Sequence, residues 1–361
     1  MSTVVRSFCK INLGLAVGPP RPDGFHGLAT AYQTLALHDL VTVAAKPAAQ
    51  TLITLVADHP HVPSTAAGNA ERNTAFRMVA AALNRLGIHA EVHLKLEKRL
   101  PVQGGLGAGS ANAAAALLGL ERELGVALSG TERLQLAAEV GSDVPLFLLG
   151  GTVLGLNRGE AVFPLPDSPA LPIVVAIPHV GVSTAQAFRE LDRRPTSDLG
   201  RVDLTHGAPA DRLEELSRVL ASMWTHTGAE RVPTGIVSSN SSRPSGGKSF
   251  VSESLHGTEG NLAGNPLLAL VRTGVENDFE AVAFRQHPSL RDIKRALAEF
   301  PDGGSAGAAY AALSGSGSAL FGVYTDLRSA REAQRRVQAL GARALLTETL
   351  DRQGYWQRMF A

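Results

Sequence analysis

The stretch from Gln103 to Ala116, QGGLGAGSANAAAA, places four glycines within seven positions and then runs directly into alanines. Glycine loses more conformational freedom on folding than any other residue, so such a cluster implies a backbone conformation or a close approach that a Cβ atom would prevent. Upstream, residues 90–101 alternate apolar and polar side chains and end at a proline, which predicts a half-buried strand. Downstream, residues 110–125 are rich in strong helix formers and end at a glycine, which predicts a helix. The glycines therefore form a loop between a strand and a helix.

A loop at the start of a helix is suited to binding an anion, because unpaired N–H groups and the positive end of the helix dipole converge there. We therefore expect this loop to bind phosphate, with a tight turn whose glycines only permit close packing as the alternative. Two other phosphate-binding motifs do not match. Ser110 stands where the dinucleotide fingerprint has its third glycine, and Lys248 lies in a GGKS stretch where Ser242 replaces the first glycine of a P-loop.

Composition limits the class of protein. The chain has 361 residues, of which 44% are hydrophobic and 19% charged, as in soluble globular proteins. Its net charge of +1 gives no reason to expect a nucleic-acid partner, and no charge-free apolar run approaches the roughly 20 residues of a membrane-spanning helix. The lone Cys9 excludes an internal disulfide, and Lys10 interrupts the N-terminus before a signal-peptide core could form. We therefore expect a cytoplasmic protein with no membrane, nucleic-acid or obligate protein partner.

Hydrophobic periodicity predicts a chain with both strands and helices. Residues 72–87 carry apolar side chains at helical spacing, and residues 329–341 open with Ser329 and Glu332 in a capping-box pattern. Because strands and helices do not alternate strictly, the predicted class is α+β. A Pro-rich stretch at residues 163–172 marks a boundary between two domains. Further strands are predicted at 11–17, 40–45, 51–57, 152–156, 171–177 and 319–324, and further helices at 131–141, 211–223 and 288–300.

One segment departs from this pattern. Residues 238–254 contain eight serines in seventeen positions, within a stretch that is also rich in glycine and proline. Such a composition buries too little apolar surface to offset the entropy lost on ordering. We therefore expect residues 228–262 to be a flexible insertion.

Three motifs together resemble the GHMP kinase superfamily: CKINLGLAV near the N-terminus, PVQGGLGAGSANAA, and LSGSGSALFGVY. In that superfamily the first long glycine loop wraps the phosphates of ATP, and the later glycine motif closes the site from the other side. DGFH, GSDVPLF and NDFE add a closer likeness to one member, which acts in the methylerythritol phosphate route to isoprenoid precursors. The resemblance covers residues 8–57, 71–190 and 261–325.

The resemblance implies a small-molecule kinase with the two-domain GHMP kinase fold, of α+β class, and an active site in the cleft between the domains. Residues 1–160 would form the N-terminal ATP-binding domain and residues 161–361 the C-terminal substrate domain. The implied reaction uses ATP and Mg²⁺ to phosphorylate the 2-hydroxyl of 4-diphosphocytidyl-2-C-methyl-D-erythritol, giving the 2-phosphate and ADP. Two alternatives stay open: a GHMP kinase for a smaller alcohol, which has no need of DGFH, and a silent sensor that binds ATP only.

Asp143 and Lys10 are the candidate catalytic pair. Asp143 is followed directly by apolar residues, where partial desolvation raises the basicity of a carboxylate. Lys10 places a charge inside an apolar strand, which is costly unless that charge is paired. The residues alone fit a structural salt bridge equally well. The resemblance implies that Asp143 is the catalytic base on the acceptor hydroxyl, and that Lys10 lies beside it to stabilise the carboxylate and the developing charge. Both residues also argue against a silent sensor.

The resemblance also implies the binding residues. Asn12 and His26 would hydrogen-bond the cytosine edge, while Phe25 and Phe188 would stack on its two faces, each with an ordinary core position as the alternative. Ser110 would lie near Mg²⁺. Adenine would contact Asn73 and Lys98, and the acceptor's diphosphate and the transferred phosphoryl group would lie near Gly315, Ser316 and Gly317. The phosphate loop would comprise Pro101, Val102, Gln103, Gly104, Gly105, Leu106, Gly107, Ala108, Gly109, Ser110 and Ala111.

Overall fold

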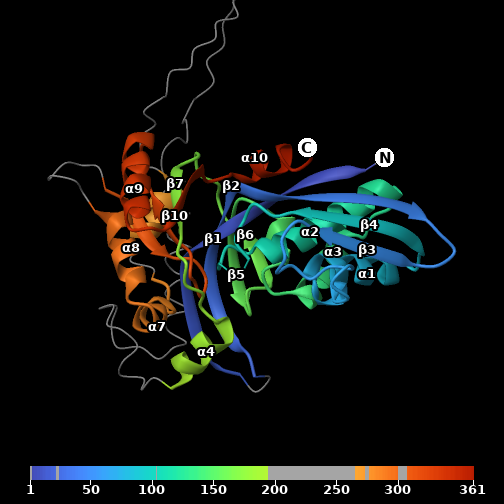
Figure 1. Cartoon of the computed structure of the whole chain (residues 1–361), viewed down its shortest axis with the longest axis horizontal. Coiled ribbons are helices and arrows are strands. Elements are labelled where there is room, and N and C mark those ends of the chain that lie inside the picture. Colours follow the sequence, from blue (N-terminus) through green and yellow to red (C-terminus); the bar gives the residue numbers. More distant parts are fainter. Residues whose placement is uncertain (1, 22–23, 103, 194–264, 273–275, 300–306) are drawn as a thin grey trace, which may run out of the picture.

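The centre of the molecule is a long antiparallel hairpin, β1 (Thr3–Pro20) and β2 (His26–Pro47), which curves between its two halves (Figure 1). β2 pairs with β1 along one edge, and with β4 (Ala90–Glu97) and β5 (Thr152–Asn157) along the other. The outer strands β3 (Leu52–Ala57) and β6 (Ala161–Pro164) pair with β4 and β5 and complete a six-stranded sheet. The computed structural model describes residues 2–21, 24–102, 104–193, 265–272, 276–299 and 307–361.

α1 (Thr74–Leu86) and α2 (Ala108–Leu124) pack on this first sheet, and α3 (Gly130–Val140) packs against α1 (Figure 1). α2 can lie directly on β1 and β2 because its buried side consists largely of small residues. At Gly119, a Cβ atom would lie 2.6 Å from a methyl carbon of Val43. Close packing along the whole helix therefore fixes the place of its first turn. Short 3-10 helices precede α1 at Ala70–Arg72 and follow α3 at Pro145–Leu148.

The second half of the molecule is built on a four-stranded antiparallel sheet in the order β10 (Arg343–Glu348), β7 (Pro172–Ile177), β9 (Leu320–Val323) and β8 (Tyr310–Leu313). α8 (Ser289–Ala298) and α9 (Leu327–Ala339) pack against this sheet and bury a second apolar core (Figure 1). No helix in the described part of the chain combines the length and hydropathy needed to cross a membrane. The described part of this half also contains α4 (Thr184–Asp192), α6 (Pro266–Arg272), α7 (Glu280–Gln286) and, at the C-terminal end, α10 (Arg352–Gln357).

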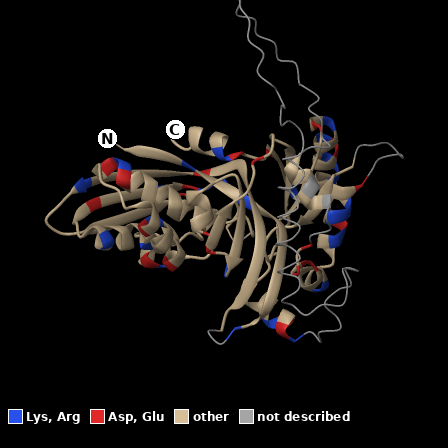
Figure 2. Cartoon of the chain, turned by 180° about the vertical axis from the view of Figure 1, so that it is seen from behind, with Lys and Arg blue, Asp and Glu red and all other residues tan. Residues whose placement is uncertain are grey.

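The chain returns to the first sheet at its C-terminal end. α10 packs into the first core, where the Tyr355 hydroxyl donates to the carbonyl of Phe147 at 2.7 Å. Beside β1, the Arg6 N–H donates to the Met359 carbonyl at 2.7 Å. The last segment therefore connects the two halves. The two ends of the chain lie near each other in both views (Figure 1, Figure 2), and the Ala361 N–H donates to the Val4 carbonyl at 3.0 Å.

Most of the elements predicted from periodicity are present, and two differences have a clear cause. β2 begins at His26 rather than at residue 40, because residues 29–35 are buried on both faces and show no alternation. The capping box expected at Ser329 is wrong: α9 begins at Leu327, and the Asp326 carboxylate caps it by accepting the Ser329 N–H at 2.8 Å.

Two further expectations concern the second half of the chain. The helix predicted at 211–223 and the insertion predicted at 228–262 lie outside the described residues. The division into residues 1–160 and 161–361 stays a prediction.

Candidate active site

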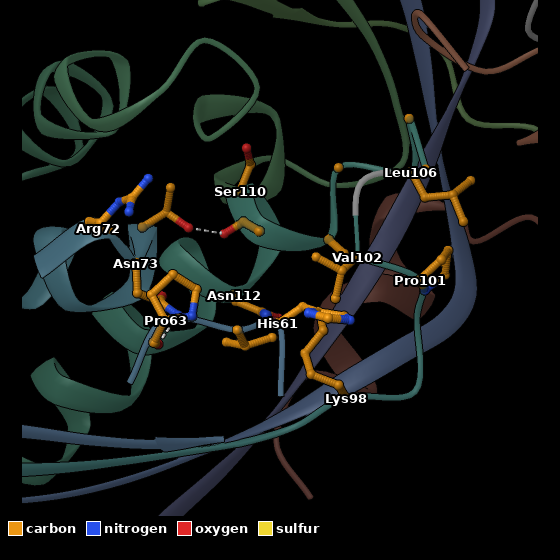
Figure 3. A pocket seen from close by; sticks show the side chains of 17 residues that line it. His61, Pro63, Arg72, Asn73, Lys98, Pro101, Val102, Leu106, Ser110 and Asn112 are labelled. Carbon is orange, nitrogen blue, oxygen red and sulfur yellow. Dashed lines mark hydrogen bonds between the residues drawn. The ribbon is translucent and has the colours of Figure 1, made fainter. Parts of the chain in front are cut away.

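A cavity of about 340 Å³ lies between the glycine loop and the segment that leads into α1 (Figure 3). This size falls within the range of small-molecule sites in proteins. His61, Pro63 and Arg72 contribute one wall, and the loop between β4 and α2 contributes the other. Of the residues predicted to bind ATP, Gln103 lies outside the described residues, and Ala111 is buried and does not line the cavity. The others line the cavity: Asn73, Lys98, Pro101, Val102, Gly104, Gly105, Leu106, Gly107, Ala108, Gly109 and Ser110.

The glycine loop needs glycine at two positions for both conformation and space. Gly105 has φ +77° and Gly107 has φ +69°, in the left-handed region that L side chains rarely adopt. A Cβ atom on Gly105 would overlap the carbonyl oxygen of Ser314, and one on Gly107 would lie 3.0 Å from the Lys10 side chain. The loop therefore packs tightly between β1 and the second glycine motif, which is the stretch LSGSGS of residues 313–318.

The first turn of α2 keeps its N–H groups available for a ligand. Gly107 is the N-cap of α2, and no side chain in the described part of the chain caps this end. By contrast, Ser129 and Glu132 form a full capping box at the start of α3, although the sequence analysis did not predict it. An uncapped, glycine-bordered helix start that opens into a cavity is the arrangement that binds phosphate groups.

A buried polar network forms the floor of the cavity. Lys98 pairs with Asp39, whose Oδ1 also accepts the N–H groups of Arg99 and Leu100 at 2.8 Å each. Asn112 bridges the two side chains. Its amide nitrogen donates to Asp39 Oδ2 at 3.2 Å, and its amide oxygen accepts from Lys98 Nζ at 3.3 Å. Removing either charge would leave the other buried and unpaired, so the network fixes the strand end from which the glycine loop departs.

Asn73 stands at the N-terminal end of α1 and lines the same cavity. Its Oδ1 caps the helix by accepting the Ala75 N–H at 2.9 Å, and its Nδ2 donates to the Pro63 carbonyl at 3.2 Å. Next to it, the Thr74 hydroxyl donates to the Gly109 carbonyl at 2.7 Å, which joins α1 to the start of α2 (Figure 3). These bonds hold the two walls of the cavity at a fixed separation.

Lys10 and Asp143 meet beside the glycine loop, as the sequence analysis expected. Lys10 is 3% exposed, and its Nζ lies 3.5 Å from Asp143 Oδ2, while the Asp143 side chain is 33% exposed. The Lys10 backbone N–H donates to the Leu106 carbonyl at 3.0 Å, so β1 carries the lysine directly under the loop. The pair thus combines a buried cation with a carboxylate that a ligand can reach.

Asn12 lies with Lys10 rather than with His26. Its Oδ1 accepts from Lys10 Nζ at 2.6 Å, and its Nδ2 donates to the Thr30 hydroxyl at 2.8 Å. On β2, Tyr32 is the register partner of Asn12, whereas His26 is the partner of Pro20. Six residues of strand separate these positions, roughly 20 Å at the usual rise. The four residues expected to recognise cytosine are therefore not one cluster.

His26, Phe25 and Phe188 lie near the far end of the hairpin. The His26 ring stacks on Phe188 with centroids 4.9 Å apart, and its Nε2 lies 3.3 Å from Asp192 Oδ1. Phe25 is 50% exposed, and the guanidinium of Arg158 lies 5.0 Å from its ring centroid. This end of the hairpin therefore offers aromatic faces on which a planar base can stack.

The second glycine motif packs against the first. Ser314 donates from its hydroxyl to the Gly105 carbonyl at 3.0 Å, and the Ala319 N–H donates to the Gly104 carbonyl at 3.2 Å. Gly315 comes close to Lys10, because a Cβ atom on it would lie 3.5 Å from Lys10 Nζ. Ser316 shares a hydrogen bond of 2.7 Å with the Thr184 hydroxyl. Lys10 thus lies between the two glycine motifs.

Several residues that organise the site were not predicted from the sequence. Asn277, in NDFE, donates to the carbonyls of Leu313 and Gly315 at 2.9 and 2.7 Å and so holds the second glycine motif. Tyr32 donates its hydroxyl to Asp143 Oδ1 at 3.0 Å. A single polar residue in an apolar stretch was an available signal for Asp39 and for Asn112, but Tyr32 resembles an ordinary core residue in the sequence.

Comparisons with known proteins agree with this geometry. Residues 73–151 match the family described as GHMP kinases N terminal domain, and residues 264–343 match GHMP kinases C terminal. A crystal structure of 4-(cytidine 5'-diphospho)-2C-methyl-D-erythritol kinase is 26% identical, with a TM-score of 0.61, and the match covers 97% of this chain and 99% of that one. A homoserine kinase from Cytophaga hutchinsonii, 19% identical with a TM-score of 0.61 and coverage of 97% and 95%, shares the fold.

Two curated relatives extend over most of the chain. The 4-diphosphocytidyl-2-C-methyl-D-erythritol kinase of Solibacter usitatus is 36% identical over 89% of this chain and 81% of its own length. The protein of the same name from Moorella thermoacetica is 32% identical over 95% of this chain and 98% of its own length. The chain therefore belongs to the 4-diphosphocytidyl-2-C-methyl-D-erythritol kinase family of the GHMP kinases.

Proposed function

We propose that this protein transfers the γ-phosphoryl group of ATP to the 2-hydroxyl of 4-diphosphocytidyl-2-C-methyl-D-erythritol, giving the 2-phosphate and ADP. The observation that carries the proposal is the position of the Lys10–Asp143 pair. Lys10 lies between two glycine motifs that suit phosphate groups, and Asp143 beside it is open to an acceptor. The names of the relatives supply the acceptor and its role in isoprenoid precursor synthesis.

The nucleotide would lie in the cavity of Figure 3. The N–H groups of the glycine loop and the first turn of α2 would bind its phosphates. Asn73 and Lys98 would face the adenine. An ammonium group has three N–H donors, and Asp39 and Asn112 take two of those of Lys98, so one remains for a ligand.

In the transfer step, Asp143 accepts the proton of the acceptor hydroxyl as that oxygen forms a bond to the γ-phosphorus. The bond between the γ-phosphorus and the bridging oxygen breaks, and its electron pair leaves with ADP. Phosphoryl transfer requires mainly positioning and stabilisation of charge, together with a base for the nucleophile. The buried Lys10 ammonium, next to Asp143 and to Gly315, would stabilise negative charge where it develops.

Mg²⁺ is the metal that this chemistry implies. Magnesium is usually held by substrate phosphates, waters and one or two protein oxygens, and it neutralises charge on the phosphates. No group of three His, Cys, Asp or Glu side chains in the described part of the chain is arranged to hold a metal ion. The Ser110 hydroxyl, in the first turn of α2 and on the cavity wall, fits such a phosphate-bound ion as a protein ligand.

We propose that the two domains bind different substrates, the N-terminal domain the nucleotide and the C-terminal domain part of the acceptor. Residues 1–160 contain the nucleotide cavity, and residues 161–361 contribute Phe188 and the second glycine motif to the acceptor side. Phe25, His26 and Phe188 would bind the cytosine, while Gly315, Ser316 and Gly317 would lie along the diphosphate. We also infer a cytoplasmic enzyme that requires no protein partner. The lone Cys9 supports this location because it is buried and forms no disulfide.

The substrate is tested with a coupled assay of ADP release. The purified protein is given Mg-ATP with the cytidylated substrate, with methylerythritol phosphate that lacks the cytidine, or with homoserine, mevalonate or galactose. We expect turnover of the cytidylated compound alone. Equal turnover of methylerythritol phosphate would contradict the role of the aromatic residues in binding a base. Turnover of homoserine or mevalonate instead would replace the proposed acceptor with a smaller alcohol.

A further inference from the structure

Tyr32 is a buried tyrosine whose hydroxyl reaches the proposed catalytic base. It lies on β2, opposite Asn12, with 2% of its surface exposed. Its hydroxyl donates to Asp143 Oδ1 at 3.0 Å, and Lys10 Nζ lies 5.5 Å from its ring centroid. Tyr32 therefore contacts both members of the catalytic pair.

The two oxygens of the Asp143 carboxylate have different partners. Oδ1 accepts the Tyr32 hydroxyl, whereas Oδ2 lies 3.5 Å from Lys10 Nζ. With one oxygen fixed by a donor from β2, the carboxylate cannot rotate freely about its last bond. Oδ2 is then held toward Lys10 and the open side of the site, where an acceptor hydroxyl can reach it.

The backbone holds the Tyr32 ring in this position. A Cβ atom on Gly155 would lie 2.5 Å from a ring carbon of Tyr32, and one on Gly159 would lie 2.5 Å from its hydroxyl oxygen. Gly159 has φ +101°, which only glycine adopts without strain. Two glycines of the β5–β6 hairpin thus leave a space that the tyrosine fills, with its hydroxyl directed to Asp143.

The Tyr32 hydroxyl remains a donor throughout the working range of an enzyme. Burial raises the pKa of this phenol well above its usual value, and the neighbouring Asp143 carboxylate raises it further. Tyr32 therefore keeps its proton and does not compete with Asp143 as a base.

We propose that Tyr32 is the positioning residue of the catalytic carboxylate and orients Asp143 for removal of the proton from the acceptor hydroxyl. This inference rests on the proposed function, because it assumes that Asp143 acts as the base. Two effects oppose each other when the hydroxyl is removed. A carboxylate without this donor is somewhat more basic, a gain of less than about tenfold. Misplacement of the reacting group costs on the order of 100-fold, so the loss dominates.

The test compares Tyr32→Phe with the wild type in the ADP-release assay. The phenylalanine keeps the ring that fills the space at Gly155 and Gly159. We expect kcat to fall by about 10- to 100-fold while KM for ATP and for the acceptor stays within about twofold, because the hydroxyl acts only on the base. A purely structural role would instead lower thermal stability and leave kcat per folded molecule unchanged.

Tyr324→Phe is the matched control. The Tyr324 hydroxyl is also buried beside a glycine, Gly322, but donates to the Leu297 carbonyl at 2.8 Å in the second core. This variant should show a comparable loss of thermal stability and the wild-type kcat. A similar loss of kcat in both variants would overturn the specific role of Tyr32.

A double-mutant cycle separates this inference from the proposed function. In an Asp143→Asn enzyme, adding Tyr32→Phe should change the residual rate by less than about twofold, since the group that Tyr32 orients is no longer a base. If Tyr32→Phe lowers the rate by the same factor in the Asp143→Asn enzyme as in the wild type, the inference is overturned. If Asp143→Asn keeps most of its kcat, the proposed function of Asp143 fails. If Asp143→Asn is inactive but Tyr32→Phe retains the wild-type rate, only the role of Tyr32 fails.

Discussion

At the scale of single residues, the surroundings of Lys10 determine which side chain can stand in the proposed catalytic pair. A Cβ atom on Gly107 would lie 3.0 Å from the lysine Cγ, and one on Gly315 would lie 3.5 Å from its Nζ. Asn12 accepts from the ammonium at 2.6 Å. The site therefore holds a compact ammonium group, and nothing broader fits between the two glycine motifs.

We expect Asp143→Asn to lower kcat by at least about 100-fold with ATP binding close to that of the wild type, because the variant loses the proposed general base and leaves the cavity unchanged. Lys10→Met should also lower kcat. Lys10→Arg should not restore it, since a planar guanidinium cannot occupy the place of a compact ammonium. Steady-state kinetics and binding of an ATP analogue measure these effects. An Asp143→Asn enzyme with most of its kcat would show that the carboxylate is structural.

A charge in an apolar strand and the first cluster of glycines are unusual in sequence, and the resemblance predicted that Lys10 lies beside Asp143. The partners of Asp39, Asn112 and Tyr32 were not predictable. Each residue acts through a partner on another element, and the partner becomes visible only when β2, α2 and the loop after α3 pack together. Asn12 was predicted as a site residue, but its partner Lys10 was not foreseen.

At the scale of elements, the central feature is the contact between two glycine loops from the two halves of the chain. Gly105 lies against the Ser314 carbonyl, and Gly104 accepts the Ala319 N–H at 3.2 Å. The first glycine loop is therefore supported by a segment more than two hundred residues away in sequence. Its shape depends on the first sheet and the second sheet together.

Gly105→Ala tests this contact, because its Cβ would overlap the Ser314 carbonyl and separate the loops. We expect KM for ATP to rise by about tenfold or more and the melting temperature to fall. Gly125→Ala is the control: Gly125, at the other end of α2, also has a positive φ, +64°, with nothing within 4 Å of its Cβ position. It should lose about 1–2 kcal/mol from backbone strain and keep the wild-type KM. Equal KM values in the two variants would mean that the contact does not shape the loop.

The ends of helices and strands could be predicted where the local sequence pattern favoured one structure only. The alternation in β4 and the alanine-rich run of α2 were sufficient to place the strand, the loop and the helix. β2 was predicted too short because its residues 29–35 are buried on both faces. At α9, Ser329 fitted a cap, but Asp326 lies one turn earlier and binds the Ser329 N–H and hydroxyl itself.

At the scale of the whole molecule, α10 joins the second sheet to the first. Tyr355 donates to the Phe147 carbonyl at 2.7 Å, and Trp356 donates from Nε1 to the Leu149 carbonyl at 3.0 Å. Both acceptors lie in the segment that follows Asp143. The C-terminal helix therefore holds the segment that follows Asp143, an arrangement that no local sequence pattern indicates.

We expect Tyr355→Ala to lower the free energy of unfolding by about 3–5 kcal/mol, because the variant leaves a large cavity in the first core. Tyr355→Phe fills the same space and loses only the hydrogen bond to Phe147, so its cost should be about 1 kcal/mol. Urea denaturation of both variants measures the difference. Equal losses would mean that the hydroxyl, and not the ring, supports this contact.

The β1–β2 hairpin has a consequence for how substrates are selected. Lys10, Asn12 and Tyr32 lie midway along it, and Phe25 and His26 lie at its tip. The paired strands between them, with register shifts after Asn12 and after Val17, fix the separation. Under the proposed roles, the hairpin acts as a molecular ruler between the group that is recognised and the hydroxyl that reacts. A short alcohol could occupy the reacting end but not reach the tip, so the enzyme would discriminate by the length of its acceptor as well as by its chemistry.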